Sequence, residues 1–585
     1  MAPVVAVGNH QGDFPLTSID YTTMSLHKIF LPILASSLLL GASGAMAQSP
    51  TDVYRNSMRE IHGTARAQAM SNAVGALGAD PTAVSVNPAG IGLYRSSEVT
   101  LGFDFGHVKS STNWQDKEGT DMSKWVGNLD HLSIIFPVTN PYLASSDWRV
   151  VLGASMSSLY DYDRDYEMRS VNPEYSLSEY IANKATLFGA PYKTLGSMSS
   201  SPYFLGTMAY NGGFIETRPG YDNIYVPATY AAIDPFAPDK YAEPNVTYLK
   251  PDAGRLNVSE KGSRKMYDFT IGGSWADKVY FGATLRTTSS TYARSSIYRE
   301  DFNYTYKPNY NVENQVYYTE LGNSLTVAGG TVGASFGLMA AIGDFGRIGI
   351  SYNTPQFGRY NEVFYTTTQW YNNNRTNGKG ELEPLYTNGT DDMTNTYNLM
   401  LPGDLTASAM VFLGGYGMVT YDFNWRDLGS ARLQGSDFQD ANQFLKEDYG
   451  SQMTHRVGLE IRPMSGLYLR AGYSYSDGGL KSEGIRPQEG NVMAYDYIAS
   501  GAITDAVMRD SYQSISAGVG CRLFGRTTLD LAYVRGKATE RVFPFPGTGE
   551  VMDQSGQVLA PGISSEGADM STVTDRMVAS LTFRF

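Results

Sequence analysis

The sequence has a single cysteine among 585 residues, Cys521, so no disulfide can form within the chain. Histidine is also scarce, with six residues, and none of them shows the HxxxH or HExxH spacing of a metal site. No Ser/His or Asp/His pair that a membrane hydrolase would need can be placed. We therefore predict no enzyme activity, no metal and no cofactor.

The chain also lacks an excess of positive charge and has no long apolar runs. Lys and Arg number 45 against 58 Asp and Glu, and the net charge of −13 argues against a nucleic-acid partner. After residue 47 no apolar run reaches 18 residues, so the sequence predicts no membrane-spanning helix. A mean hydropathy of −0.28 is typical of soluble proteins. In a membrane β-barrel, however, only alternate residues face lipid, so composition leaves a soluble all-β protein and a membrane barrel equally open.

The N-terminal segment 24–47 has the three parts of a secretory signal peptide. Lys28 provides the basic start, residues 29–40 form the apolar core, and Ala45-Met46-Ala47 is a small-x-small cleavage signal. The apolar core is too short to span a bilayer. We predict cleavage near Ala47, before Gln48. Residues 1–47 are thus leader and signal peptide, and Met24 is the expected true start.

The C-terminal segment 574–585 alternates apolar and polar residues and ends on an aromatic residue, Phe585. One face carries Met577, Ala579, Leu581, Phe583 and Phe585. The same period of two recurs at 457–462, 467–475 and 529–533. Alternation with aromatics near the strand ends is typical of membrane-barrel strands, although strands of a soluble sandwich alternate too.

Connection lengths decide between these two folds. The sequence predicts fourteen strands, at 97–109, 129–138, 147–161, 264–275, 278–296, 315–341, 345–368, 404–414, 416–428, 452–463, 466–477, 511–524, 526–541 and 572–585. Short connections alternate with long ones at 110–128, 162–263, 297–314, 369–403, 429–451, 478–510 and 542–571. Outer-membrane barrels alternate in this way. We predict an all-β fold, a 14-stranded antiparallel transmembrane β-barrel over residues 97–585, in a bacterial outer membrane. Its largest extracellular loop is 162–263.

Residues 48–96 separate the signal peptide from the first strand, and we call them the hatch. Ala-rich positions between 58 and 77 recur at helical spacing, Asp80-Pro81 predicts the start of a turn, and Asn87-Pro88-Ala89-Gly90 predicts another turn. A barrel of about fourteen strands is wide enough to need filling. We predict a small helical hatch inside the lumen; the alternative is a plain helix that caps one end of the barrel.

The hatch sequence ALGADPTAVSVNPAGIGLY resembles that of the FadL-type outer-membrane transporters of long-chain fatty acids and aromatic hydrocarbons. Leu401-Pro402-Gly403-Asp404, before the eighth predicted strand, is similar to a Leu-Pro strand entry in that family. The resemblance implies passive transport of hydrophobic compounds, captured by the extracellular loops and released sideways through a kinked strand. It also implies a monomer. The gating residues would be Asp80, Asn87, Pro88, Ala89 and Gly90.

Apolar side chains in the loop 162–263 are candidates for capturing such a ligand. They are Leu187, Phe188, Phe204, Leu205, Met208 and Phe214. An apolar groove in an outer loop needs residues of this kind, but they could equally form the loop's own small core. Gly153, in the third predicted strand, could mark a bulge or kink, or be one of many tolerated barrel glycines.

Three functions fit these features. The first is passive transport of a hydrophobic ligand, with outer-membrane lipid and lipopolysaccharide as surroundings and the barrel-assembly machinery recognising Phe585. The second is a plugged general porin, against which the hatch argues. The third is a surface-exposed barrel that serves adhesion or assembly through its long loops.

Overall fold

The computed structural model describes residues 50–115, 117–138, 147–189, 191, 204–218, 221–227, 250–304, 315–376, 382–435, 438–481, 503–552, 556, 558–563 and 567–585. The predicted signal peptide, residues 1–47, lies outside these ranges, as do parts of the loop 162–263. No helix within the described ranges has the length and apolarity to cross a membrane.

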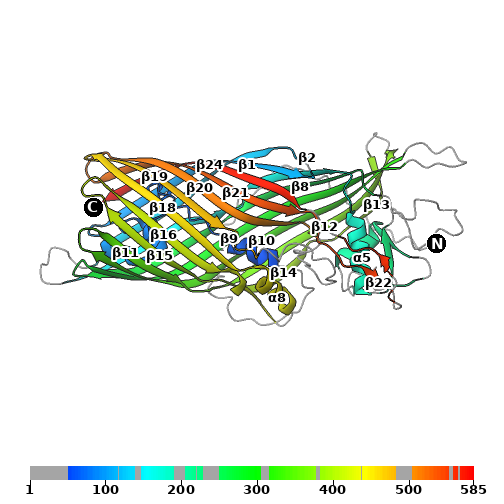
Figure 1. The fold of residues 1–585 in the computed structure, drawn as a ribbon, viewed down its shortest axis with the longest axis horizontal. Coiled ribbons are helices and arrows are strands. Elements are labelled where there is room, and N and C mark those ends of the chain that lie inside the picture. The colour runs from blue at the N-terminus through cyan, green and yellow to red at the C-terminus, as the bar shows by residue number, and fades with distance from the viewer. Residues whose placement is uncertain are drawn as a thin grey trace, which may run out of the picture. The chain divides into compact units, whose positions relative to one another are not determined.

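The described strands close into an antiparallel barrel of fourteen strands, as predicted (Figure 1). We call these strands the wall. They are β1 (Glu98–Trp114), β3 (Met122–Pro137), β4 (Trp148–Asp161), β8 (Ala253–Trp275), β9 (Val279–Tyr304), β10 (Gln315–Ile342), β11 (Gly346–Asn353) with β12 (Gln356–Thr376), β14 (Met393–Leu401) with β15 (Asp404–Phe412), β16 (Gly417–Asp427), β18 (Ser451–Met464), β19 (Leu467–Asp477), β20 (Ala506–Arg522), β21 (Thr527–Phe543) and β24 (Ala568–Arg584). The barrel closes where β1 pairs with β24, from Glu98 opposite Arg584 to Asn113 opposite Asp569.

The alternation in the sequence determines which face each side chain takes. In β10, Val332, Phe336 and Leu338 are exposed on the outside, whereas Ser335 and Met339 are buried inside. An apolar outer face with a polar inner face is what a bilayer requires of a barrel, because every backbone polar group must be paired within the sheet.

Several predicted strand boundaries are wrong; the fourth strand begins at Ala253 rather than 264, and the fifth ends at Tyr304 rather than 296. The eighth strand begins at Met393 rather than 404, because β14 continues β15 across Pro402-Gly403. The predicted loop 110–128 also contains strand, since β1 runs to Trp114 and β3 starts at Met122. The β14 segment does alternate, with Tyr397, Leu399 and Leu401 buried, but Pro402 interrupts the pattern. The added parts of β1 and β3 are mostly polar and give little signal in the sequence.

The loops carry short elements of their own, and α5 and β22 lie at the end of the barrel opposite the C-terminus (Figure 1). The helices are α5 (Leu177–Phe188), α7 (Phe204–Asn211), η3 (Leu428–Ser430) and α8 (Gln439–Asp448). The strands are β2 (Lys117–Glu118), β5 (Arg164–Val171), β6 (Ile215–Thr217), β7 (Tyr225–Pro227), β13 (Leu382–Gly389), β17 (Arg432–Gln434), β22 (Val551–Met552) and β23 (Val558–Ala560).

The hatch lies inside the lumen and contacts strands around the whole wall. Backbone N–H groups of Ala65 and Gly75 donate to Ser580 Oγ in β24 (3.1 Å) and to Asp422 Oδ2 in β16 (2.9 Å). On other sides, His62 N donates to the carbonyl of Ser158 in β4 (2.8 Å). A helix capping one end of the barrel could not make these contacts.

The predicted continuous helix between 58 and 77 is wrong. The hatch is built from α2 (Pro50–Ser57), α3 (Ala65–Gln68), α4 (Pro81–Val86) and the 3-10 helix η1 (Pro88–Leu93). Residues between α2 and α3 are extended and bond to β4, while Ser71 and Asn72 have positive φ. Hydrogen bonds to the wall thus replace the backbone hydrogen bonds of a continuous helix. The small alanine side chains allow the hatch to pack closely against the wall.

Candidate functional site: the lumen between hatch and wall

The Asn-Pro-Ala-Gly segment is fastened to the wall by hydrogen bonds. Asn87 caps η1, its Oδ1 accepting from Ala89 N (3.1 Å), and its Nδ2 donates to the carbonyls of Gly75 (3.0 Å) and Leu338 (3.4 Å). Next to it, Ser351 Oγ donates to the carbonyl of Val86 (2.8 Å). The segment predicted as a simple turn is therefore the start of a 3-10 helix that docks on β10 and β11.

Arg286 of β9 adds a buried charge to this docking. Its guanidinium donates to both carboxylate oxygens of Asp268 (2.7 and 2.8 Å) and to the carbonyl of Ser85 in α4 (2.7 Å). A bidentate pair that also holds a backbone carbonyl fixes position in two directions. The hatch is thus tied to β8, β9, β10 and β11 over a few residues.

Glycines in these strands make room for the hatch. A Cβ on Gly337 would lie 2.0 Å from Asn87 Oδ1, and one on Gly282 would lie 2.2 Å from the Pro88 carbonyl oxygen. Any side chain at these positions would overlap the hatch. The wall is therefore shaped to receive the Asn-Pro-Ala-Gly segment.

We expect Gly337→Val to push this segment off the wall and open a leak. Overpacking of this kind costs roughly 1–3 kcal/mol, which displaces a docked segment more easily than it unfolds a closed sheet. Single-channel recording in planar bilayers would then show a several-fold higher open-state conductance than wild type. Gly127→Val is the control, because its Cβ would meet only ordinary contacts of 3.5 Å and beyond. Equal conductance of both variants would contradict the docking role.

Asp80 holds the two halves of the hatch together. It caps α4, its Oδ1 accepting from Thr82 N (2.9 Å), and both its oxygens accept from Thr64 Oγ1 (3.0 Å), which itself caps α3. The sequence interpretation of Asp80-Pro81 as the start of a turn is therefore replaced by a helix start, with Pro81 at the first helical position.

We expect Asp80→Ala to loosen the hatch by about 1–2 kcal/mol, the usual cost of losing an N-cap. Hydrogen–deuterium exchange of peptides covering 64–86 would rise, while exchange in wall strands would not change. Asp80→Asn keeps an acceptor for Thr82 N and should restore most of the protection. Protection that is unchanged in Asp80→Ala would show that the cap does not hold the hatch.

The candidate capture residues do not form one surface. Leu205, Met208 and Phe214 are at most 1% exposed and belong to the packed core of the outer loops. Leu187 and Phe188, at the end of α5, are exposed by 37% and 45%. Leu205, Met208 and Phe214 therefore form part of the loop's own core, as the alternative prediction had it.

The remaining capture candidate, Phe204, packs edge-on against Phe364 of β12, with ring centroids 5.8 Å apart. In the same loop, Ser176 and Glu179 form a capping box at the start of α5. Burial raises the pKa of the Glu179 carboxyl. This part of the loop is thus a small folded unit rather than an open groove.

Gly153 does not mark a bulge. The pairing of β4 with β3 and β8 runs through Gly153 without a shift, and the irregularity in β4 falls between Ser158 and Tyr160. A Cβ on Gly153 would lie 3.0 Å from Ile91 Cδ1 of η1. This glycine is better explained by close approach of the hatch.

Residues 333–337, Gly-Ala-Ser-Phe-Gly, match a nucleophile-elbow pattern but lie inside β10. A nucleophile elbow is a sharp turn between a strand and a helix, whereas β10 pairs with β9 in unbroken register through this stretch. The pattern therefore carries no catalytic meaning at this place.

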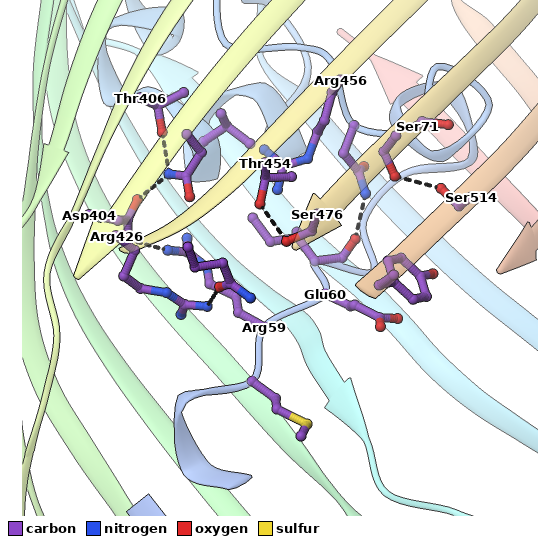
Figure 2. Close-up of a pocket in the computed structure, with 18 of the residues that line it drawn as sticks. Arg59, Glu60, Ser71, Asp404, Thr406, Arg426, Thr454, Arg456, Ser476 and Ser514 are labelled. Atoms are coloured by element: carbon purple, nitrogen blue, oxygen red, sulfur yellow. Dashed lines mark hydrogen bonds and ion pairs between the residues drawn. The ribbon is translucent and has the colours of Figure 1, made fainter. Parts of the chain in front are cut away.

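A cavity of about 90 Å³, partly open to solvent, lies between the hatch and the wall; we call it the hatch cavity (Figure 2). Five arginines line it, against the two carboxylates of Glu60 and Asp404. The arginines are Arg59, Arg426, Arg456, Arg509 and Arg576. With the carboxylates ionised, the lining has an excess of three positive charges.

Two of these arginines are neutralised by partners in the same cavity. Arg59 Nη1 lies 2.7 Å from Asp404 Oδ2, and Arg509 Nη1 lies 3.3 Å from Glu60 Oε1. Within the described part of the chain, Arg426, Arg456 and Arg576 form no ion pair. Arg426 instead donates to the carbonyl of Ser57 (2.7 Å) and to Gln452. The cavity thus offers cationic groups to a ligand.

Apolar side chains share the lining with these arginines. They are Met58, Ile61, Val86, Leu428 and Val534. A second cavity, of about 70 Å³, is lined by tyrosines, by Leu325 and Ile503, and by three arginines and three carboxylates, and it shares Tyr54 and Met58 with the first. The two cavities thus place apolar side chains close to cationic groups between the hatch and the wall.

The sequence does not predict that these arginines gather at one place. Arg426, Arg456, Arg509 and Arg576 come from four different strands, β16, β18, β20 and β24, far apart in the chain. Each appears in its strand as an ordinary inward polar residue. Only barrel closure shows that they face the same stretch of hatch.

No protein-family model and no curated protein matches the chain. Solved structures do match, among them a Pseudomonas aeruginosa FadL homologue (12% identity, 90% of this chain and 98% of the other, TM-score 0.44). Others are the Pseudomonas putida toluene transporter TodX (13%, 89% and 98%, TM-score 0.42) and the Ralstonia pickettii toluene transporter TbuX (12%, 88% and 98%, TM-score 0.39). The chain is similar to these structures at low identity, so its function has to be argued from its own geometry.

Proposed function

We propose that this protein is an outer-membrane transporter of hydrophobic compounds that carry an anionic group, such as long-chain fatty acids. The observation that carries the proposal is the hatch cavity, where three arginines without an ion pair lie beside apolar side chains. A carboxylate would bind the guanidinium groups, and the hydrocarbon tail would leave water for the apolar lining. No step of this transport is catalytic.

The hatch is the proposed gate. It occupies the lumen and is held in part by hydrogen bonds that are individually weak, so a shift of a few of them would connect the hatch cavity with the rest of the lumen. The signal peptide expected at 24–47 and the apolar outer face of the wall support an outer-membrane location.

A second candidate is a hatch-gated pore for small water-soluble anions. The polar character of most of the cavity lining favours it, because arginines attract any anion. The two candidates differ in the role of the apolar side chains, which only an amphipathic ligand would use.

Labelled oleate uptake by a deletion strain distinguishes these candidates, with complementation by the wild type or by a variant lacking residues 48–78. Uptake that depends on the protein and changes when the hatch is removed supports the transporter. If oleate uptake does not depend on the protein, while small anions cross faster without the hatch, the protein is a plugged anion pore. If neither solute depends on the protein, both transport proposals fall and an adhesion or assembly role is left.

A further inference from the structure

We propose that His62, Asp104 and Asp130 form a binding site for a divalent transition-metal ion of the zinc class, which would fasten the hatch to the wall. The three residues come from the extended hatch segment, β1 and β3, and each offers a ligand atom within 4.8 Å of the others. All three are buried, with exposures of 3%, 6% and 0%.

The contact between His62 and Asp130 has the spacing of two metal ligands rather than that of a hydrogen bond. Nδ1 of His62 and Oδ1 of Asp130 are 3.4 Å apart, within the range of an ion pair when the imidazole is protonated, but neither atom makes a hydrogen bond. Two atoms that each lie about 2.0–2.1 Å from a tetrahedral zinc ion are roughly 3.3 Å apart. With a neutral His62, both buried atoms lack a hydrogen-bond partner, which is costly unless a cation bridges them.

The second oxygen of Asp130 and one oxygen of Asp104 are held by hydrogen bonds from neighbouring groups. Gln68 Nε2 donates to Asp130 Oδ2 (3.1 Å), and the backbone N–H of Asn128 donates to Asp104 Oδ1 (3.1 Å). One oxygen of each carboxylate is thereby oriented and the other is left for a cation. Outer partners of this kind are a regular feature of metal sites.

A β-bulge turns Asp130 into the lumen. In the ladder between β1 and β3, Gly102 pairs with His131 and Phe103 pairs with Leu129, so Asp130 is the extra residue. Bulges re-aim a side chain and are frequent next to functional sites. Here the bulge brings Asp130 to the same face as His131, which is also fully buried.

The charge around the cluster allows a cation. Besides His62 itself, Arg576 of β24 is a positive group that acts on both carboxylates, and Asp161 adds a negative charge near Asp104. With three carboxylates against one guanidinium, a doubly charged ion would bring this region to neutrality. His62 would then ligate in its neutral form through Nδ1.

Metal binding to the detergent-solubilised protein tests the proposal. The protein carries no polyhistidine tag and is first stripped with EDTA; ZnCl2 is then titrated by calorimetry and CoCl2 by visible absorption. We expect one ion per chain, a visible cobalt d–d band, and a paramagnetically shifted imidazole resonance in the cobalt form. Loss of an outer partner weakens such sites about 10–100-fold, so His62→Gln and Asp130→Asn should weaken binding by at least about 100-fold.

His455→Gln is the matched control, because His455 is exposed and bonds only to Tyr421. Retention of the folded form on unheated gels verifies that each variant is folded, and Asp104→Asn replaces any variant that is not. The proposal is overturned if the wild type binds neither ion, if no imidazole resonance is shifted, or if folded His62→Gln binds as tightly as the wild type. Because the measurement is binding alone, its outcome does not depend on whether the protein transports fatty acids.

Discussion

A disulfide between the hatch and β20 is expected to stop uptake almost completely. Ser71 Oγ and Ser516 Oγ are 2.8 Å apart, and Ser71 N also donates to Ser516 Oγ (3.0 Å). Cysteines at these two positions come close enough to join without moving the backbone far. In a Cys521→Ser background, oxidised Ser71→Cys/Ser516→Cys would hold this part of the hatch against the wall.

If the hatch must shift for a ligand to pass, the oxidised form should lose at least about tenfold in oleate uptake, equal to raising the barrier by about 1.4 kcal/mol or more. Addition of a reductant should restore uptake in the same preparation. Each single cysteine variant should behave as wild type under both conditions. This reversal separates a locked gate from a barrel that has simply misfolded.

A second cross-link controls for general stiffening of the barrel. Thr270 Oγ1 and Thr284 Oγ1, on neighbouring strands β8 and β9, are 2.7 Å apart and line neither of the two cavities. Oxidised Thr270→Cys/Thr284→Cys joins wall to wall and should transport normally. If the hatch-to-wall disulfide forms and uptake continues unchanged, movement of this part of the hatch is not needed and the gate must be placed elsewhere.

The wall could be predicted from the sequence because each strand by itself shows the alternation of apolar and polar residues. Val332, Phe336 and Leu338 appear outside in the structure for the reason that made them recognisable, a period of two. Pro402 interrupts that pattern, so the sequence predicts a loop where the strand portion before it, β14, lies. Pattern reading thus works within a strand and fails where proline interrupts it.

The path of the hatch could not be predicted in the same way. Ala65, Ala69 and Ala73 show helical spacing, yet α3 ends at Gln68, because Ser516 and Asp422 offer hydrogen bonds to the backbone that the chain alone does not reveal. Tertiary partners here override a helix preference worth only tenths of a kcal/mol per residue. The close contact of Gly337 with Asn87 is equally invisible in sequence.

Recognition of a ligand's anionic group should depend most on Arg456. Its guanidinium lines the hatch cavity and makes no ion pair among the described residues, although Asp422 lies opposite it in the ladder between β16 and β18, so it can bind a ligand carboxylate. At an effective dielectric constant of about 20, one ion pair at 4 Å is worth about 4 kcal/mol, and part of this is lost to desolvation. Arg456→Glu turns that attraction into repulsion, so oleate should bind roughly 100-fold more weakly.

The oleate methyl ester separates charge from shape in this experiment. It has the same tail without the negative charge, so its affinity should change little between wild type and Arg456→Glu, and Arg456→Gln should give an intermediate value for oleate. Arg535→Glu, an outward position on β21 that is far less buried, is the control for adding the same charge elsewhere. Equal losses for acid and ester would mean that the substitution distorts the cavity. Unchanged binding of both would place the anionic group away from the hatch cavity, leaving the apolar side chains around Tyr54 and Met58 to recognise the ligand by its tail alone.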